Sequence, residues 1–306
     1  MRTIQLGKTE LQVSAIAVGC MRINGIDKRA AENFVKTAIE LGANFFDHAD
    51  IYGGGECESV FADAIGMNST VRVKVLLQSK CGIVPGKMFD FSKKHIVGAT
   101  EGILKRLKTD YLDVLLLHRP DALVEPEEVA EAFDSLRADG KVLNFGVSNQ
   151  DPNLIELLKR YVSQPIAANQ LQLSITNATM ITQTMNMNMP DEPSLSRDNG
   201  VLNYCRLNDI TIQPWSPFQY GFFEGVFLDN AKFPKLNAKI DEIAKRYGVS
   251  NTTIALAWLL RHPAKMQPVT GTMNLERLRD CVRATEITLT REEWYEVYLA
   301  AGHRLP

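Results

Sequence analysis

Short apolar runs alternate with longer amphipathic stretches along most of the chain. Runs such as 112–117 (LDVLLL) are typical of buried β-strands, whereas apolar residues between Asp27 and Gly42 recur every three or four positions, as on one helix face. The runs predict strands at 16–20, 44–46, 75–79, 112–117, 144–147, 167–171, 211–215 and 266–269. Helices are predicted at 28–41, 58–65, 94–107, 126–138, 152–160, 201–207, 236–247, 251–262 and 275–284.

These elements make about eight strand–helix units with no break in composition between them. Strands that alternate with helices over ~250 residues are typical of a closed parallel (β/α)8 barrel, the TIM barrel. We therefore expect an α/β protein with one barrel domain over residues 1–306. Two further runs, 4–6 and 11–13, flank a Gly-Lys-Thr-Glu turn and predict an N-terminal β-hairpin before the barrel.

Composition and charge limit the classes of partner. The 306 residues are 45% hydrophobic and carry a formal net charge of −2, so they offer no basic surface for nucleic acid or an anionic membrane. No apolar run approaches the ~18 residues of a spanning helix. The five cysteines are scattered without a Cys-x-x-Cys pair, which favours a reducing cytoplasm and gives no sign of a metal site. We expect a monomer or weak homo-oligomer with a small-molecule substrate.

Polar residues follow or end almost every predicted strand. In a (β/α)8 barrel the active site lies at the carboxyl ends of the strands, so these side chains are expected to converge on one rim. In chain order they are Asp47, Tyr52, Lys80, His118, Ser148, Asn149, Asn169, Gln170, Trp215, Gly271 and Thr272.

Four of these side chains suit proton transfer to a carbonyl oxygen. A tyrosine hydroxyl has a reference pKa near ~10, and an adjacent ammonium such as that of Lys80 would lower the pKa of Tyr52 by favouring the phenolate. The Asp47 carboxylate would keep Lys80 charged and oriented, and His118 could hydrogen-bond a substrate oxygen. An acid–base tyrosine without an acyl nucleophile suits carbonyl reduction, with hydride supplied by a nicotinamide.

An ordered set of motifs resembles the aldo-keto reductase superfamily over nearly the whole chain. The motifs are IAVGCM from Ile16, DHADIYGG, the Ser79-Lys80 strand end, LDVLLLHRPD, NFGVSN, ANQLQLS, PWSP, IALAWLLRHP and VTGT. The resemblance implies a (β/α)8 barrel with a catalytic tetrad at Asp47, Tyr52, Lys80 and His118. It also implies an NADP-dependent alcohol dehydrogenase or carbonyl reductase in which Tyr52 donates the proton.

The resemblance further implies a set of cofactor contacts. Ser148, Asn149 and Gln170 would hold the nicotinamide carboxamide, and Trp215 would stack on its ring. Gly271, Thr272, Arg277 and Asp280 would bind the 2′-phosphate and adenine end, and Met21, Ser216 and Phe218 would line the same site.

NADPH is the expected cofactor. Residues 272–275 lie where the last strand leads into a helix N-terminus, which is a ready anion site, and Arg277 adds a guanidinium suited to phosphate. NADPH is therefore favoured over NADH. Family members often carry a lysine where this chain has Gly271, and the glycine removes part of that phosphate contact.

Several other interpretations remain open from the residues. Ser148 and Asn149 could instead cap the helix that begins near Pro152, and Trp215 could belong to the core. A metal-dependent barrel hydrolase could use Asp47, His48, Asp50 and His118, although neighbouring residues of a strand point to opposite faces. A non-catalytic NADP(H)-binding subunit or redox sensor is the alternative on the same fold.

Three segments outside the predicted strands and helices bear on the substrate pocket. The polar stretch 174–200 is either an ordered lid or disordered. The aromatic stretch 218–227 (FQYGFFEGVF) is expected to wall an apolar carbonyl pocket or to form a packed hairpin. Only a short tail is expected after Trp294, which would leave the site fairly open.

Overall fold

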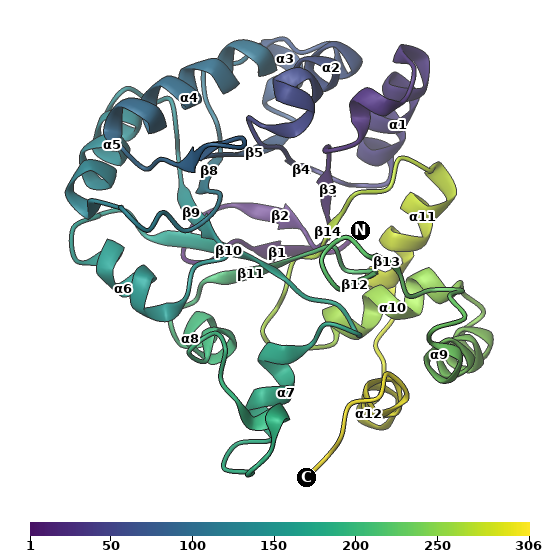
Figure 1. Cartoon of the computed structure of the whole chain (residues 1–306). Helices are drawn as coiled ribbons and strands as arrows, with labels where there is room; N and C mark the ends of the chain where they lie inside the picture. The colour runs from purple at the N-terminus through teal and green to yellow at the C-terminus, as the bar shows by residue number, and fades with distance from the viewer.

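The protein is a (β/α)8 barrel in a computed structural model that describes all residues 1–306 (Figure 1). Eight parallel strands follow one another around the barrel in chain order. They are β3 (Ala17–Gly19), β4 (Phe45–Asp47), β5 (Leu76–Cys81), β8 (Val114–Leu117), β9 (Phe145–Ser148), β10 (Ile166–Gln172), β11 (Thr211–Trp215) and β14 (Val269–Thr270). The amide of Gln267, just before β14, donates to the Ile212 carbonyl of β11 at 3.0 Å, which joins the two outermost strands. The predicted fold class is confirmed.

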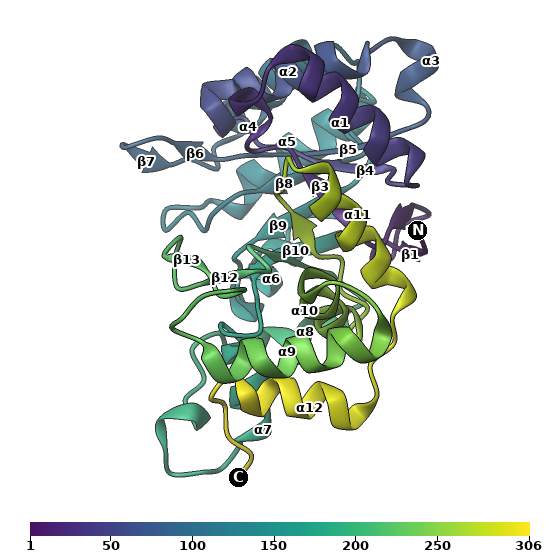
Figure 2. The same cartoon turned by 90° about the vertical axis from the view of Figure 1, so that its right-hand side faces the viewer.

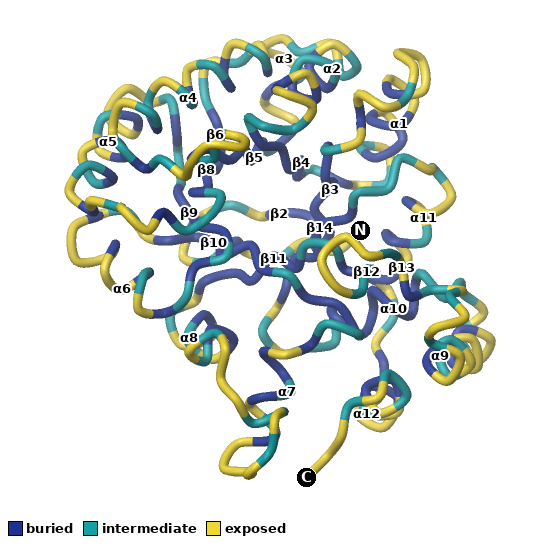
Figure 3. Tube along the Cα trace, in the orientation of Figure 1, coloured by how far each residue is buried: buried dark blue, intermediate teal, exposed yellow.

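Helices surround the barrel and shield its strands from solvent. Figure 3 shows dark blue, buried strands at the centre and yellow outer faces on the helices. The helices that follow barrel strands are α1 (Lys28–Glu40), α2 (Glu56–Ile65), α4 (Lys93–Leu107), α5 (Pro126–Ala138), α6 (Pro152–Lys159), α8 (Val201–Leu207), α9 (Pro234–Tyr247), α10 (Asn251–Leu260) and α11 (Leu275–Arg283). The remaining helices are α3 (Ser69–Arg72), α7 (Thr179–Met185) and α12 (Arg291–Ala300). No helix has both the length and the apolar composition that crossing a membrane requires.

Three small hairpins lie outside the barrel sheet. They are β1 (Thr3–Gln5) with β2 (Gln12–Ser14), β6 (Ile83–Val84) with β7 (Met88–Phe89), and β12 (Gln219–Tyr220) with β13 (Gly225–Val226). Figure 2 shows β1 at one end of the barrel and the other two hairpins at the opposite end. The first of them is the predicted N-terminal hairpin.

The β1–β2 hairpin closes the end of the barrel at which the parallel strands begin. Gly7 in its turn has φ +52° and donates its amide to Thr211 Oγ1 at 2.8 Å. A Cβ atom at this position would lie 2.4 Å from the Ala167 carbonyl oxygen, so only glycine permits the close approach. Leu6 and Val13 then complete a small apolar core with residues of the strands.

The end of the chain forms a helix, and only residues 301–306 follow it as a short tail. Thr290 and Glu293 form a capping box that starts α12, and the sequence pattern Thr-x-x-Glu signals it. Trp294 of α12 stacks on Trp258 of α10 with ring centroids 4.7 Å apart. Each indole N–H donates to the other residue's carbonyl at 3.0 Å, so the helix is tightly held against the barrel.

Candidate active site

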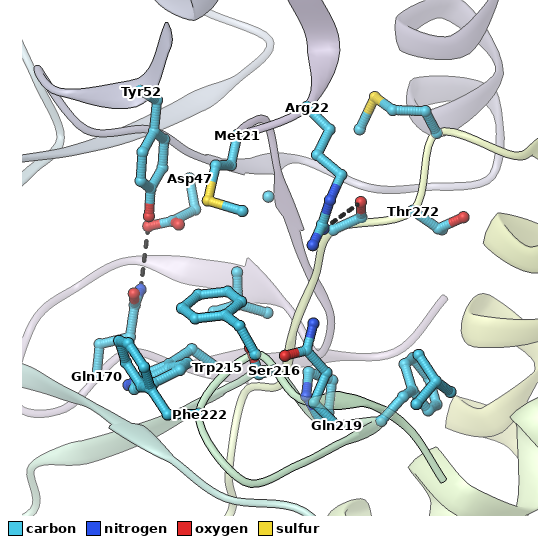
Figure 4. Close-up of a pocket in the computed structure, with 18 of the residues that line it drawn as sticks. Met21, Arg22, Asp47, Tyr52, Gln170, Trp215, Ser216, Gln219, Phe222 and Thr272 are labelled. Atoms are coloured by element: carbon cyan, nitrogen blue, oxygen red, sulfur yellow. Dashed lines mark hydrogen bonds between the residues drawn. The ribbon is translucent and has the colours of Figure 1, made fainter. Parts of the chain in front are cut away.

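A cavity of about 1020 Å³ opens at the end of the barrel where the parallel strands finish. Figure 4 shows Tyr52 and Asp47 on one side of it, Gln170 and Trp215 across from them, and Thr272 at its far end. The sequence-predicted residues that line it are Met21, Asp47, Tyr52, His118, Ser148, Asn149, Gln170, Trp215, Ser216, Phe218, Gly271, Thr272 and Arg277. The strand ends therefore bring residues from most of the chain to one rim, as the barrel predicts.

Lys80 lies directly behind this lining and is fully buried. Its ammonium donates to Asp47 Oδ2 at 2.8 Å, to the His48 carbonyl at 2.7 Å and to Tyr52 Oη at 3.1 Å. Because an ammonium has three donors, every one of them is used. The arrangement ties strand β5, which carries Lys80, to β4 and to the tyrosine on the loop that follows β4.

Asp47 is held by amides as well as by Lys80. Its Oδ1 accepts from Gln78 Nε2 at 2.6 Å and from Gln170 Nε2 at 3.1 Å. Gln78 and Gln213 exchange hydrogen bonds, and Gln213 also donates to Gln267 Oε1 at 2.9 Å. A buried chain of glutamine amides therefore fills this part of the barrel interior and fixes the carboxylate.

The pKa of Tyr52 moves in the opposite direction from the one expected. Burial raises the pKa of its hydroxyl, and the lowering effect of the nearby Lys80 ammonium does not outweigh this. Burial by itself would lower the pKa of Lys80, but the Asp47 carboxylate and Tyr52 raise the net value. The tyrosine thus stays protonated and the lysine charged around neutral pH.

His118 lies beside Tyr52 at the end of β8. The two rings are nearly perpendicular, with centroids 6.0 Å apart. The Nδ1 atom of His118 is buried and has no hydrogen-bond partner. Burial, with the charges of Lys80 and Arg119, holds the pKa of the imidazole well below its usual value, so the ring is neutral at physiological pH.

Residues at the ends of β9, β10 and β11 interlock through their side chains. Ser148 Oγ donates to the Gln170 carbonyl at 3.0 Å, and Asn149 Nδ2 donates to Ser148 Oγ at 2.8 Å. Trp215 Nε1 donates to Asn149 Oδ1 at 3.1 Å. The cap of α6 is Asp151, so the interpretation of Ser148 and Asn149 as helix caps is wrong.

Asn169 is the strand-end residue that the structure keeps out of the cavity. Its Nδ2 donates to the Gln150 carbonyl at 2.8 Å, and the side chain does not contribute to the lining. Gln170, the next residue, faces Asp47 because successive residues of a strand point to opposite sides.

The segment 174–200, expected to be either a lid or disordered, contributes no residue to the lining. It contains α7, which α12 contacts through the Tyr298 hydroxyl and Thr182 Oγ1 at 3.0 Å.

An aromatic hairpin forms one wall of the cavity, as the stretch 218–227 predicted. Phe222 and Phe223 lie in the turn between β12 and β13, and both are at least half exposed. Phe223 stacks on Trp215 at 6.0 Å between centroids, and Phe222 meets the same indole edge-on at 6.2 Å. Trp215 is therefore a pocket residue and not part of the barrel core.

The far end of the cavity is built from β14 and the start of α11. Asn274 caps α11 by accepting from the Arg277 amide, and Thr272 Oγ1 accepts from the Asn274 amide at 3.1 Å. Two of the amides expected to be free for an anion are thus already bonded. Asp280, assigned to the adenine end, does not line the cavity.

Arg22 reaches across to this end from the loop after β3. Its Nη1 donates to the Gly271 carbonyl at 3.1 Å (dashed in Figure 4). A Cβ atom at position 271 would lie 2.7 Å from that nitrogen. The guanidinium of Arg22 therefore occupies the space that a side chain at position 271 would need.

The residues of the metal-hydrolase interpretation do not assemble. His48 turns away from Asp47 and packs its ring against Phe61 at 4.6 Å between centroids. No group of three or more His, Cys, Asp or Glu side chains is placed to hold a metal ion. The alternation of side chains along β4 is the reason.

Sequence reasoning missed several cavity residues. The two cations Arg22 and Arg119, and the polar residues Asp229 and Thr252, all line it. Arg119 directly follows His118 in the LLLHRPD motif, which is the one signal that could have identified it. Arg22 and Gly271 are far apart in sequence, so only the closed barrel reveals their contact.

The chain is similar to several known proteins over nearly its whole length. The profile of the Aldo/keto reductase family matches residues 15–298. The 6-dehydroglucose reductase of Agrobacterium fabrum is 35% identical, with 95% of each chain covered. The crystal structure of a thermostable aldo-keto reductase, Tm1743, in complex with the inhibitor epalrestat superposes with a TM-score of 0.78 at 28% identity, covering 98% of this chain and 100% of the other. A putative voltage-gated potassium channel subunit beta of Schizosaccharomyces pombe is 28% identical, with 92% of this chain and 87% of the relative covered.

Proposed function

Because the chain belongs to the aldo/keto reductase family of oxidoreductases, we propose that it reduces an aldehyde or ketone to the alcohol with NADPH. The observation that carries this proposal is the position of Lys80. A fully buried ammonium joins the Asp47 carboxylate to the Tyr52 hydroxyl at hydrogen-bond distance, directly behind the cavity wall. A relative named 6-dehydroglucose reductase supports reduction as the chemistry.

Tyr52 is the proton donor in this proposal. Its raised pKa keeps the hydroxyl protonated, so it can give its proton to the carbonyl oxygen as negative charge develops there. Lys80 then stabilises the phenolate that remains, since its ammonium already donates to Tyr52 Oη. Asp47 keeps Lys80 charged and fixes its position through the buried ion pair.

His118 orients the substrate. The neutral imidazole lies beside Tyr52 and lines the cavity. A neutral ring can donate one hydrogen bond to the carbonyl oxygen without competing for the proton that Tyr52 supplies. Tyr52 and His118 together form the polar pair at which the reacting oxygen binds.

The residues around the cavity fit an NADP(H) molecule. Ser148, Asn149 and Gln170 offer amide and hydroxyl groups for the carboxamide, and Trp215 offers an aromatic face. The α11 N-terminus with Arg277, and Arg22 above Gly271, supply positive potential for phosphates. When bound, the cofactor supplies the hydride.

Tyr52→Phe tests the proposal. Purified wild type should oxidise NADPH in the presence of a panel of aldehydes and ketones, followed by the absorbance of the reduced nicotinamide. The variant should lose turnover by at least about a hundredfold while keeping NADPH affinity in a fluorescence titration, because only the proton donor is removed. Turnover by Tyr52→Phe at the wild-type rate would refute the proton-donor role.

The second candidate is a non-catalytic NADP(H)-binding subunit. The similarity to a putative potassium channel subunit beta favours it. Tight NADPH binding without turnover on any carbonyl of the panel would replace the reductase proposal by this one. Failure to bind either dinucleotide would exclude both.

A further inference from the structure

We propose that Arg119 makes this cavity selective for carbonyl compounds that carry a carboxylate. This inference rests on the proposed reductase function and names the substrate class of the same site. Arg119 follows His118 at the end of β8 and lines the cavity, so its charge lies beside the pair that would hold the carbonyl oxygen.

The guanidinium of Arg119 has no partner in the protein. It is half-buried, yet it makes no ion pair and no hydrogen bond. Other arginines at buried positions are paired: Arg72 Nη2 contacts Asp113 Oδ2 at 2.7 Å, and Arg106 Nε contacts Glu58 Oε2 at 2.7 Å. Arg119 is thus the unpaired one of the three, and an anionic ligand in the cavity would supply its missing partner.

Aromatic rings hold the guanidinium in place without using its donors. The Arg119 Cζ atom lies 5.6 Å from the Trp215 ring centroid and 5.9 Å from that of Phe222. An arginine that packs on aromatic faces keeps its N–H groups at the edge of the plane, in the fork that matches two carboxylate oxygens. Burial lowers the pKa of Arg119 from its ordinary high value, and the group remains cationic.

Nearby carboxylates are already occupied. Asp47 is bonded to Lys80, Gln78 and Gln170. Asp121, two residues along the chain, accepts from the Phe91 amide at 2.9 Å and from the Leu123 amide at 2.8 Å. Neither makes an ion pair with Arg119, so a ligand carboxylate would meet a guanidinium that neither has neutralised.

Apolar residues line the same cavity, among them Ile51, Ile83 and Phe222, and the Phe222 ring lies beside the guanidinium. A substrate with a short apolar or aromatic body between its carbonyl and its carboxylate matches this lining. The aldehyde would lie at Tyr52 and His118 while the carboxylate contacts Arg119.

The test compares two aldehydes that differ in charge and hardly in shape. We would measure kcat/KM with NADPH for para-carboxybenzaldehyde and para-formylbenzamide in wild type, Arg119→Gln, Arg119→Lys and the control Arg160→Gln, whose arginine is exposed and outside the cavity. Wild type and the control should prefer the carboxylate by about ten- to a hundredfold. Arg119→Gln should bring the ratio close to one, chiefly through KM, and Arg119→Lys should keep part of it.

Salt provides a second measurement. Recognition of one charge by another weakens as ionic strength rises, so the preference for the carboxylate should fall with added salt in wild type and stay flat in Arg119→Gln. A wild-type ratio near one with measurable turnover of both aldehydes would overturn the role of Arg119 alone. The absence of turnover with either aldehyde and with the wider carbonyl panel would overturn the proposed function itself, and this inference with it.

Discussion

Replacing Lys80 by methionine tests the buried ion pair that organises the site. Methionine keeps most of the side-chain volume but removes the ammonium, and with it the hydrogen bonds to Asp47 Oδ2, the His48 carbonyl and Tyr52 Oη. The first two acceptors are then left buried without this donor. Asp47 retains only the amides of Gln78 and Gln170.

The expected loss of stability follows from these lost contacts. Removing one partner of a buried ion pair costs about 3–5 kcal/mol, because the remaining charge keeps its desolvation penalty. For a chain of 306 residues that corresponds to a fall in Tm of roughly 5–8 °C. Lys80→Met with Asp47→Asn should be less destabilised than Lys80→Met alone, because the second change removes the unpaired charge.

The assay is a double-mutant cycle. Urea unfolding followed by circular dichroism would compare wild type, Asp47→Asn, Lys80→Met and the double variant. A loss below about 1 kcal/mol in Lys80→Met, together with additive single changes, would refute the reasoning, because it would mean that the pair contributes no coupling. The same samples, titrated with NADPH, report whether the cofactor site survives.

Three further predictions concern pH and the far end of the cavity. Since burial raises the pKa of Tyr52 and lowers that of His118, kcat/KM for carbonyl reduction should be flat between about pH 6 and pH 9, and a limb near the ordinary histidine pKa would contradict this. Gly271→Ala should displace Arg22 and weaken NADPH binding about tenfold in a fluorescence titration, whereas unchanged affinity would show that the guanidinium is not needed there. Burial and Glu58 raise the pKa of Asp50 to about 7, so wild type should lose stability as pH rises from about 4 to about 7, by at most about 4 kcal/mol. Asp50→Asn should abolish that slope in urea unfolding, and an equal slope in both proteins would contradict the assignment.

The periodicity of the chain determined the barrel and the rim. Apolar runs that alternate with amphipathic stretches leave few alternatives to a parallel closed sheet, and residues that end the strands must then meet at one end. Asp47, Tyr52, Lys80 and His118 could be identified in this way because each one stands at or just after an apolar run. The sequence also carries a local signal for the start of α12, the capping pair Thr290 and Glu293, although no helix was predicted there.

The tertiary structure decided everything that depends on long-range neighbours. The direction of the Tyr52 pKa depends on how far burial outweighs one ammonium, and burial is a property of the packed molecule. The contact of Arg22 with Gly271 joins the loop after the first barrel strand to the loop after the last one. Arg119 differs from Arg72 and Arg106 because no acidic side chain reaches it. Local sequence specifies strands, helices and caps, since these follow from neighbours a few positions apart, whereas partners, solvent exposure and free charges are set by contacts that only the closed fold creates.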